Sequence, residues 1–194
     1  MNERAQRAAS VLRRITYARV VVVPVVMWLI LEEPVEGARP VAAGLFGVAA
    51  ITDFLDGYLA RRWAATTTFG SFLDTTADKL LVSGVLIALV AVDRASAWVA
   101  AIIVGRELII MGLRGAVASD GTVIRPSIWG KLKANVQFVA VFLAIVRPRV
   151  TIGPLLLDEW AMAAAAVVTV LSAVEYLARF SARLVAAQQR RARR

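Results

Sequence analysis

Long runs of apolar residues alternate along the whole chain with short segments rich in charge. Six such runs have about the length, roughly 20 residues, that an α-helix needs to cross a membrane. The pattern therefore predicts an all-α integral membrane protein built as a bundle of six transmembrane helices. The spans that we expect lie approximately at 15–31, 40–58, 71–92, 95–113, 129–146 and 159–178.

The polar segments at the two ends of the chain have different expected roles. Segment 1–14 carries four arginines, and we expect it to form a juxtamembrane amphipathic helix on the membrane surface. No small-residue cleavage site follows it, so we do not expect a removable signal peptide. Segment 181–194 is a basic tail suited to anionic lipid headgroups. A chain of this length is filled by one bundle, so we expect a single membrane domain over 1–194.

The connecting segments differ in charge from one side of the bundle to the other. The connection after the first span is acidic, and those after the third and fifth spans carry few net charges. Arginine and lysine collect instead in segment 1–14, in the other two connections and in the basic tail. Because positive charge favours the cytoplasmic side, both termini are predicted to be cytoplasmic. An even number of spans agrees with this topology.

Composition narrows the chemistry that the chain can perform. Hydrophobic residues make up 59% of it and the mean hydropathy is +0.69, whereas soluble domains are about 45–50% apolar. Cysteine and histidine are absent, which excludes disulfides, thiol nucleophiles and imidazole acid–base catalysis. The net charge is +9, and the basic residues flank apolar spans. They therefore indicate the topology and contact with lipid headgroups rather than binding of nucleic acid.

Four aspartates lie inside this apolar sequence, two near the end of the second expected span and two near the start of the third: Asp53, Asp56, Asp74 and Asp78. A charged side chain at membrane depth costs about 2.5–3.5 kcal/mol on insertion scales, so four together need a compensating ligand. Residues three or four apart share one helix face, and a tight hairpin brings the two pairs face to face. Carboxylate oxygens are the ligands that Mg²⁺ and Mn²⁺ prefer.

We therefore interpret the four aspartates as ligands of divalent cations. Two such ions, about 3.5–4 Å apart, can clamp a pyrophosphate. Small residues at Gly57, Ala60 and Gly70 let a ligand approach the backbone, and Arg61 is placed to meet phosphate charge. Asp78 lies deepest, where a substrate hydroxyl can reach it. Two other interpretations stay open: structural ion pairs with Arg61, Arg62 and Lys79, or a relay of acids in a cation or proton-coupled carrier.

The spacing of these residues also resembles a known family. The pattern is that of the CDP-alcohol phosphotransferases, integral membrane enzymes of phospholipid synthesis, and it reads Asp53-x2-Asp56-Gly57-x2-Ala60-Arg61-x8-Gly70-x3-Asp74-x3-Asp78. The resemblance implies that an alcohol attacks the lipid-linked phosphate of a CDP-activated lipid and that CMP leaves. It implies Mg²⁺ or Mn²⁺, with two ions bound, at Asp53, Asp56, Asp74 and Asp78. It also implies a homodimer in a bacterial-type plasma membrane.

The resemblance further implies roles for individual residues. Asp78 would be the general base for the acceptor hydroxyl as well as a contact of the second ion. The CDP-linked lipid would be held by Thr16, Arg19, Gly57, Ala60, Arg61, Thr67 and Gly70.

Other segments resemble the family members that transfer the phosphatidyl group of CDP-diacylglycerol to glycerol 3-phosphate. These are 77–79, 105–108, 112–114 and 129–133, together with Thr16, Arg19 and Pro24 near the first span. Charged groups at the cytoplasmic face could bind the phosphate of such an acceptor: Arg106, Arg114, Lys131 and Lys133.

Alternatives stay open for the acceptor and for these cations. The chain departs from the usual pattern at Arg13, Thr75, Thr76 and Ala134. Inositol phosphate, or phosphatidylglycerol giving cardiolipin, is therefore an alternative acceptor. Arg114, Lys131 and Lys133 are also explained as ordinary positive flanks of spans, and Arg106 as the structural partner of Glu107.

Overall fold

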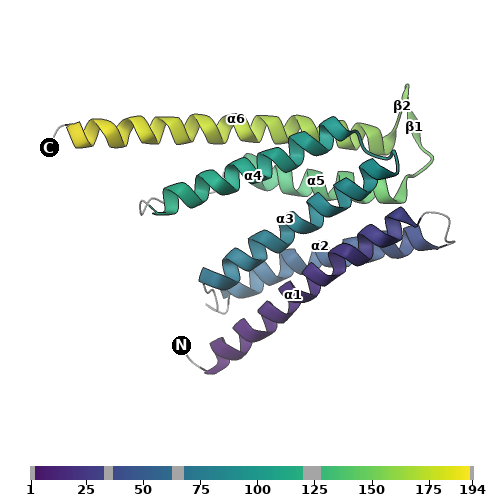
Figure 1. The fold of residues 1–194 in the computed structure, drawn as a ribbon, viewed down its shortest axis with the longest axis horizontal. Helices are drawn as coiled ribbons and strands as arrows, with labels where there is room; N and C mark the ends of the chain where they lie inside the picture. Colours follow the sequence, from purple (N-terminus) through teal and green to yellow (C-terminus); the bar gives the residue numbers. More distant parts are fainter. Residues whose placement is uncertain (1–2, 33–36, 63–67, 120–127, 193–194) are drawn as a thin grey trace.

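The computed structural model describes residues 3–32, 37–62, 68–119 and 128–192, with side-chain placements over most of 10–32, 37–55, 70–115 and 130–181. This part of the chain is almost entirely helical (Figure 1). Its elements are α1 (Glu3–Leu31), α2 (Ala38–Arg62), α3 (Thr68–Ala91), α4 (Ala97–Ser119), α5 (Ile128–Val146), β1 (Thr151–Ile152), β2 (Leu155–Leu156) and α6 (Leu157–Ala192).

Each expected span corresponds to one helix, and the differences lie at the ends. Helix α1 runs without a break from Glu3, so segment 3–14 is not a separate juxtamembrane helix as the sequence suggested. The reason is local, because no glycine or proline occurs before Pro24 to interrupt the helix. Helix α6 likewise continues through most of the basic tail to Ala192. The short hairpin β1–β2 was not expected.

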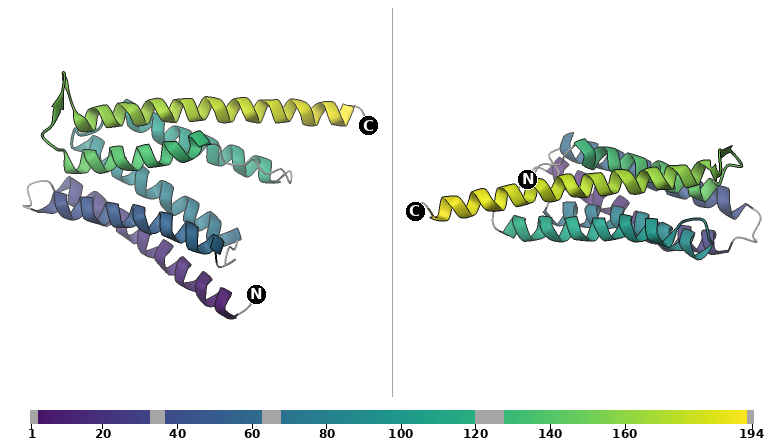
Figure 2. Two further views of the ribbon diagram at one scale, coloured as in Figure 1. Left: turned by 180° about the vertical axis from the view of Figure 1, so that it is seen from behind. Right: turned by 90° about the horizontal axis from the view of Figure 1, so that it is seen from above.

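The helices run up and down, so that alternate connections lie at the same end of the bundle. Helix α1 begins and helix α6 ends at one end, where α2 passes to α3 and α4 to α5 (Figures 1 and 2). The hairpin and the α1–α2 and α3–α4 connections lie at the opposite end. Helix α1 packs mainly on α3 and α2, helix α6 packs on α5 and α4, and α3 and α2 both touch α5. The start of α1 and the end of α6 thus lie at the same end of the bundle, and the prediction that this end faces the cytoplasm stays a prediction.

The α3–α4 connection and the β1–β2 hairpin, at the end opposite the termini, are tight and have recognisable backbone chemistry. Just after the end of helix α3, Asp93 lies in the left-handed region (φ 55°), and the Arg94 amide donates to the Leu89 carbonyl at 2.8 Å. This is the six-to-one bond of a Schellman cap. In the hairpin, Gly153 at φ 64° precedes Pro154, which suits a two-residue turn. The Trp160 indole donates to the Ile152 carbonyl at 2.9 Å and fixes the hairpin on α6.

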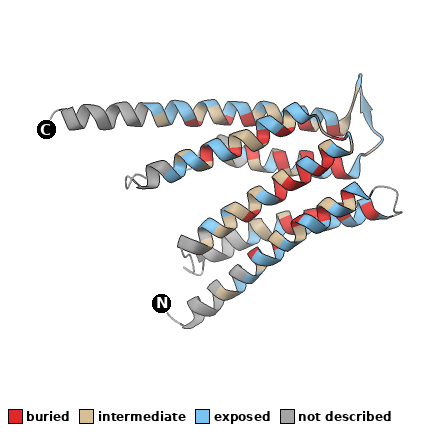
Figure 3. Ribbon diagram, viewed as in Figure 1, coloured by how far each residue is buried: buried red, intermediate tan, exposed pale blue. Residues whose placement is uncertain are grey.

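Buried apolar residues gather in the half of the bundle away from the termini (Figure 3). Helix α3 is central to this core and buries residues on most of its circumference, including Leu81, Val85 and Leu89. It approaches α1 most closely at Gly84, where an added Cβ would lie 2.8 Å from Val23 Cγ1. The buried or half-buried charged residues Arg19, Asp74 and Glu107 lie on the side of this core that is nearer the termini.

Two helices are long and apolar enough to cross a membrane by composition alone, at Arg14–Leu31 and Leu157–Ser181. Helices α3 and α4 have 24 and 23 residues, but each carries three charged side chains that lower its apolarity. Every one of the six helices nevertheless exposes large apolar residues on its outer face, for example Val21, Val48, Ile87, Trp98, Val139 and Val174. Such extensive apolar exposure is typical of a surface in contact with lipid. The number of spans stays a prediction.

Candidate active site

Two of the sequence-predicted carboxylates come together around a buried arginine. Asp53 lies late in α2 and Asp74 early in α3, and both face Arg19 of α1. Arg19 Nη1 donates to Asp53 Oδ1 at 2.6 Å and to Asp74 Oδ1 at 3.1 Å. The arginine side chain is only 1% exposed, whereas the two carboxylates are partly exposed. Carboxylates from two helices therefore already converge on one positive centre.

Asp78 lies one helical turn beyond Asp74 and faces the same interior region. Its Oδ1 atom is buried and has no hydrogen-bond partner within the described part of the chain. The charges that act on it come from Lys79, Glu107, Lys133 and Arg19. Asp78 thus lies between the Arg19 group and a second charged cluster. A buried carboxylate oxygen without a donor costs free energy, which indicates that it meets a ligand, an ion or water in the working protein.

The carboxylates fit a divalent-cation site in their chemistry. The donors are hard oxygens, two of them share one cationic partner, and Asp78 has an unpartnered oxygen. Within the side chains that the structure describes, no three acidic groups lie close enough to hold one ion. Asp56, the fourth predicted ligand, belongs to α2, but its side chain lies outside the described residues. The assignment of the four aspartates as ligands of the ions stays a prediction.

The second charged cluster is centred on Glu107 of α4, whose side chain is 8% exposed. Lys79 Nζ of α3 donates to Glu107 Oε2 at 2.9 Å, and Lys133 Nζ of α5 donates to Oε1. Arg106 Nη1 also donates to Oε1, at 3.2 Å, while its Nη2 donates to Ser172 Oγ of α6 at 2.7 Å. One carboxylate thus ties cations from three helices together, and Arg106 extends the network to a fourth.

Of the cations predicted to bind an acceptor phosphate, the structure places Arg114 apart from Arg106 and Lys133. Arg106 and Lys133 lie together at Glu107. Arg114 lies further along α4, where its guanidinium carbon is 5.6 Å from the centroid of the Tyr176 ring. This cation–π contact is worth about 0.5–1 kcal/mol at an exposed site and gives Arg114 a structural partner. The side chain of Lys131 lies outside the described residues.

The residues predicted to hold the CDP-linked lipid are only partly described. Thr16 is buried on α1 one turn before Arg19, so both share the face of α1 that meets α2 and α3. Gly70 lies in the first turn of α3, one turn before Asp74. Thr67 and the side chains of the remaining candidates lie outside the described residues: Gly57, Ala60 and Arg61.

Sequence reasoning did not assign three features of the site. It gave Arg19 to the lipid substrate and missed that this residue joins two carboxylates. It named Glu107 only as a neighbour of Arg106, and it gave Lys79 no ligand-binding role. The available signal was the presence of these charges inside apolar spans, where unpaired charge is expensive. The hydrogen bond between Gln137 and Thr169, at 2.8 Å, could also have been anticipated from the sequence. Thr169 and Ser172 are polar residues at i and i+3 in an alanine-rich helix and therefore share one face.

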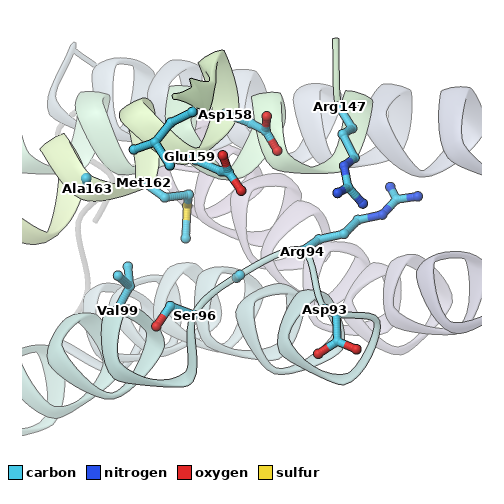
Figure 4. Close-up of a pocket in the computed structure, with 11 residues that line it drawn as sticks. Asp93, Arg94, Ser96, Val99, Arg147, Asp158, Glu159, Met162 and Ala163 are labelled. Carbon is cyan, nitrogen blue, oxygen red and sulfur yellow. The ribbon is translucent and has the colours of Figure 1, made fainter. Parts of the chain in front are cut away.

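A cavity of about 360 Å³ lies at the end of the bundle opposite the candidate active site, and Figure 4 shows the side chains that line it. It is formed where the α3–α4 connection faces the start of α6, and its charged lining comes from Asp93, Arg94, Arg147, Asp158 and Glu159. None of the sequence-predicted site residues lines it. The cavity is therefore separate from the candidate active site.

Comparison of the sequence with known proteins identifies the family to which the chain belongs. The model of the CDP-alcohol phosphatidyltransferase family matches residues 13–171, which include all six helices in whole or in part. The chain belongs to this family of transferases, whose members generally depend on divalent metal ions.

Curated relatives cover most of the chain. It is 39% identical over 172 residues to an Escherichia coli protein named CDP-diacylglycerol–glycerol-3-phosphate 3-phosphatidyltransferase, with 84% of this chain and 90% of that protein aligned. A Bacillus subtilis protein of the same name is 40% identical over 139 residues, covering 66% and 72%. A Mycobacterium tuberculosis protein named probable phosphatidylglycerophosphate synthase is 39% identical over 177 residues, covering 89% and 82%.

Proposed function

We propose that the chain transfers the phosphatidyl group of CDP-diacylglycerol to glycerol 3-phosphate and releases CMP. The observation that carries the proposal is the convergence of Asp53 and Asp74 on one cationic centre, with Asp78 one turn deeper beside a buried cationic cluster. The names of the curated relatives support the same pair of substrates.

The reaction is a substitution at the phosphorus atom bonded to diacylglycerol. The acceptor hydroxyl oxygen forms the new P–O bond, the bond to the bridging pyrophosphate oxygen breaks, and CMP leaves with that oxygen and the electron pair. Asp78 takes the hydroxyl proton as general base. Bound Mg²⁺ or Mn²⁺, two ions in our proposal, would neutralise charge on the pyrophosphate. Asp53, Asp56, Asp74 and Asp78 would hold these ions.

The substrates would be oriented by residues on both sides of the aspartates. We assign the CDP-linked lipid to the side of Thr16, Arg19 and Gly70, together with the lipid-binding candidates that lie outside the described residues. We assign the acceptor phosphate to Arg106 and Lys133, because these cations are buried beside Asp78 and a phosphate anion would offset their desolvation.

The membrane placement belongs to the same proposal. The outward apolar residues of all six helices support six spans within one membrane domain. With the termini on one side of the bundle and the basic residues near them, the site would face the cytoplasm at the plasma membrane. A homodimer stays a prediction.

An acceptor assay tests the proposed reaction. Purified protein in detergent receives CDP-diacylglycerol, Mg²⁺ and either glycerol 3-phosphate, inositol phosphate or phosphatidylglycerol, and CMP release is measured. We expect release with glycerol 3-phosphate, its loss with EDTA, and its recovery with added Mg²⁺ or Mn²⁺. Release with another acceptor but none with glycerol 3-phosphate would reject the assigned substrate, and no release with any acceptor would reject the reaction.

A further inference from the structure

The cluster around Glu107 contains more positive charge than the neighbouring carboxylates can neutralise. Lys79, Arg106 and Lys133 all bind the single carboxylate of Glu107, which leaves a surplus of two positive charges. Counting nearby Asp78 still leaves a surplus of one. Buried charge without compensation is strongly unfavourable, so a purely structural network would be expected to balance its charges. The surplus indicates that an anion completes the cluster.

The chemistry of the three cations favours a phosphate monoester. Such a group carries about 1.5–2 negative charges at neutral pH, which is enough to offset the surplus of one to two positive charges. Lys79 is the most exposed of the three, at 19% of its side chain, and the described contacts occupy one of the three donors of its ammonium group. Arg106 has its Nε atom buried without a hydrogen-bond partner among the described residues. Donors therefore remain available from both α3 and α4.

We propose that Glu107 is a positioning residue that gathers Lys79, Arg106 and Lys133 into a preformed site for the acceptor phosphate, with Lys79 as a direct phosphate ligand. This inference rests on the proposed function and adds Glu107 and Lys79 to its acceptor site. Lys79 follows Asp78 directly in α3. A phosphate held at the cluster therefore directs the hydroxyl end of the same small acceptor toward the general base. Without the carboxylate, the three cations repel each other and lose their common geometry.

The test separates acceptor binding from lipid binding. Glu107→Gln keeps the size of the side chain and removes its charge, and Lys79→Gln removes the proposed ligand. We measure kcat and the KM values for glycerol 3-phosphate and CDP-diacylglycerol separately. In both variants we expect the acceptor KM to rise about tenfold or more, as the loss of charge-assisted hydrogen bonds implies. The KM for CDP-diacylglycerol should change by less than about twofold, and Glu107→Asp should recover part of the acceptor affinity.

Glu159→Gln is the matched control, because exposed Glu159 accepts a hydrogen bond from the Leu156 amide at the end of the bundle opposite the cluster, and its acceptor KM should not change. Equal changes in both KM values, or an unchanged acceptor KM in Glu107→Gln, would overturn the inference. If Glu107→Gln does not fold, the acceptor KM of Lys79→Gln decides in the same way. A wild-type protein that releases no CMP with glycerol 3-phosphate contradicts the proposed function itself, and the inference falls with it. If the wild type is active and neither variant changes the acceptor KM, the inference is contradicted and the proposed function is not.

Discussion

At the scale of single residues, Asp78 differs from the other described aspartates of the site. Asp53 and Asp74 each have an arginine partner in Arg19, whereas Asp78 keeps a buried oxygen that no described donor reaches. A carboxylate oxygen that no donor occupies is free to accept a hydrogen bond from a substrate hydroxyl. The environment of Asp78 therefore suits a proton acceptor, whereas Asp53 and Asp74 suit the binding of cations.

We predict that Asp78→Asn lowers kcat for CMP release by about 10²–10⁴-fold, because an amide cannot take the acceptor proton. Binding of CDP-diacylglycerol should be mostly retained, and is checked by calorimetry on the same sample. Asp93→Asn is the control. Asp93 is exposed at the far end of the bundle, and asparagine tolerates its φ of 55°. The activity of Asp93→Asn should therefore differ from that of the wild type by less than about twofold. Equal activity of Asp78→Asn and wild type would remove the general-base role.

Where two site residues lie on the same helix, the sequence was enough to predict that they share a face. Asp74 and Asp78 are four residues apart in α3, so their common face follows from the helical repeat. Partners contributed by other helices were not predictable in this way. The distance from Arg19 to Asp74 spans 55 residues, and Lys79 and Glu107 are 28 residues apart. Such pairs depend on how the helices pack, and local periodicity contains no information on that.

At the scale of elements, helix α3 contributes residues both to the candidate active site and to the apolar core. Its first half carries Asp74, Asp78 and Lys79, and its second half is buried in the core. Gly84 sits at the closest approach to α1, the helix that contributes Arg19. The alignment of Arg19 with Asp74 therefore depends on a contact about three turns away in α3.

We predict that Gly84→Val destabilises the protein by about 1–3 kcal/mol and lowers activity, because the new side chain forces α1 and α3 apart. The nearest atom is Val23 Cγ1, which belongs to a stiff β-branched side chain. Thermal unfolding in detergent and CMP release report the two effects. Gly44→Val is the control on α2, where an added Cβ meets no atom within 4 Å. Similar unfolding temperatures for the two variants would contradict the close packing of α1 on α3.

The number and approximate limits of the helices followed from apolar runs bounded by polar residues. The sequence did not predict that α1 is continuous through residues 3–14. A segment rich in arginine indicates a surface helix whether or not that helix joins the next span. The β1–β2 hairpin was missed because its strands have two residues each, too short for alternation to be visible.

At the scale of the whole molecule, the account requires that the termini and the aspartates face the cytoplasm. The chain has no cysteine, which makes single-cysteine labelling direct. We predict that a membrane-impermeant maleimide labels Ser96→Cys on intact cells, because exposed Ser96 lies at the end opposite the termini. Ser181→Cys, exposed toward the end of α6, should react only after the membrane is opened. The reverse labelling pattern would contradict the assigned topology.

The most direct measurement of the central claim is the binding of Mn²⁺, followed by the loss of the electron paramagnetic resonance signal of the free ion. Purified wild-type protein should bind two Mn²⁺ per chain, as expected for a paired carboxylate site. Asp74→Asn should lose at least one, whereas Asp93→Asn should bind both. Equal binding by wild type and Asp74→Asn, or no specific binding by wild type, would contradict a site in which the carboxylates of α2 and α3 meet at divalent cations.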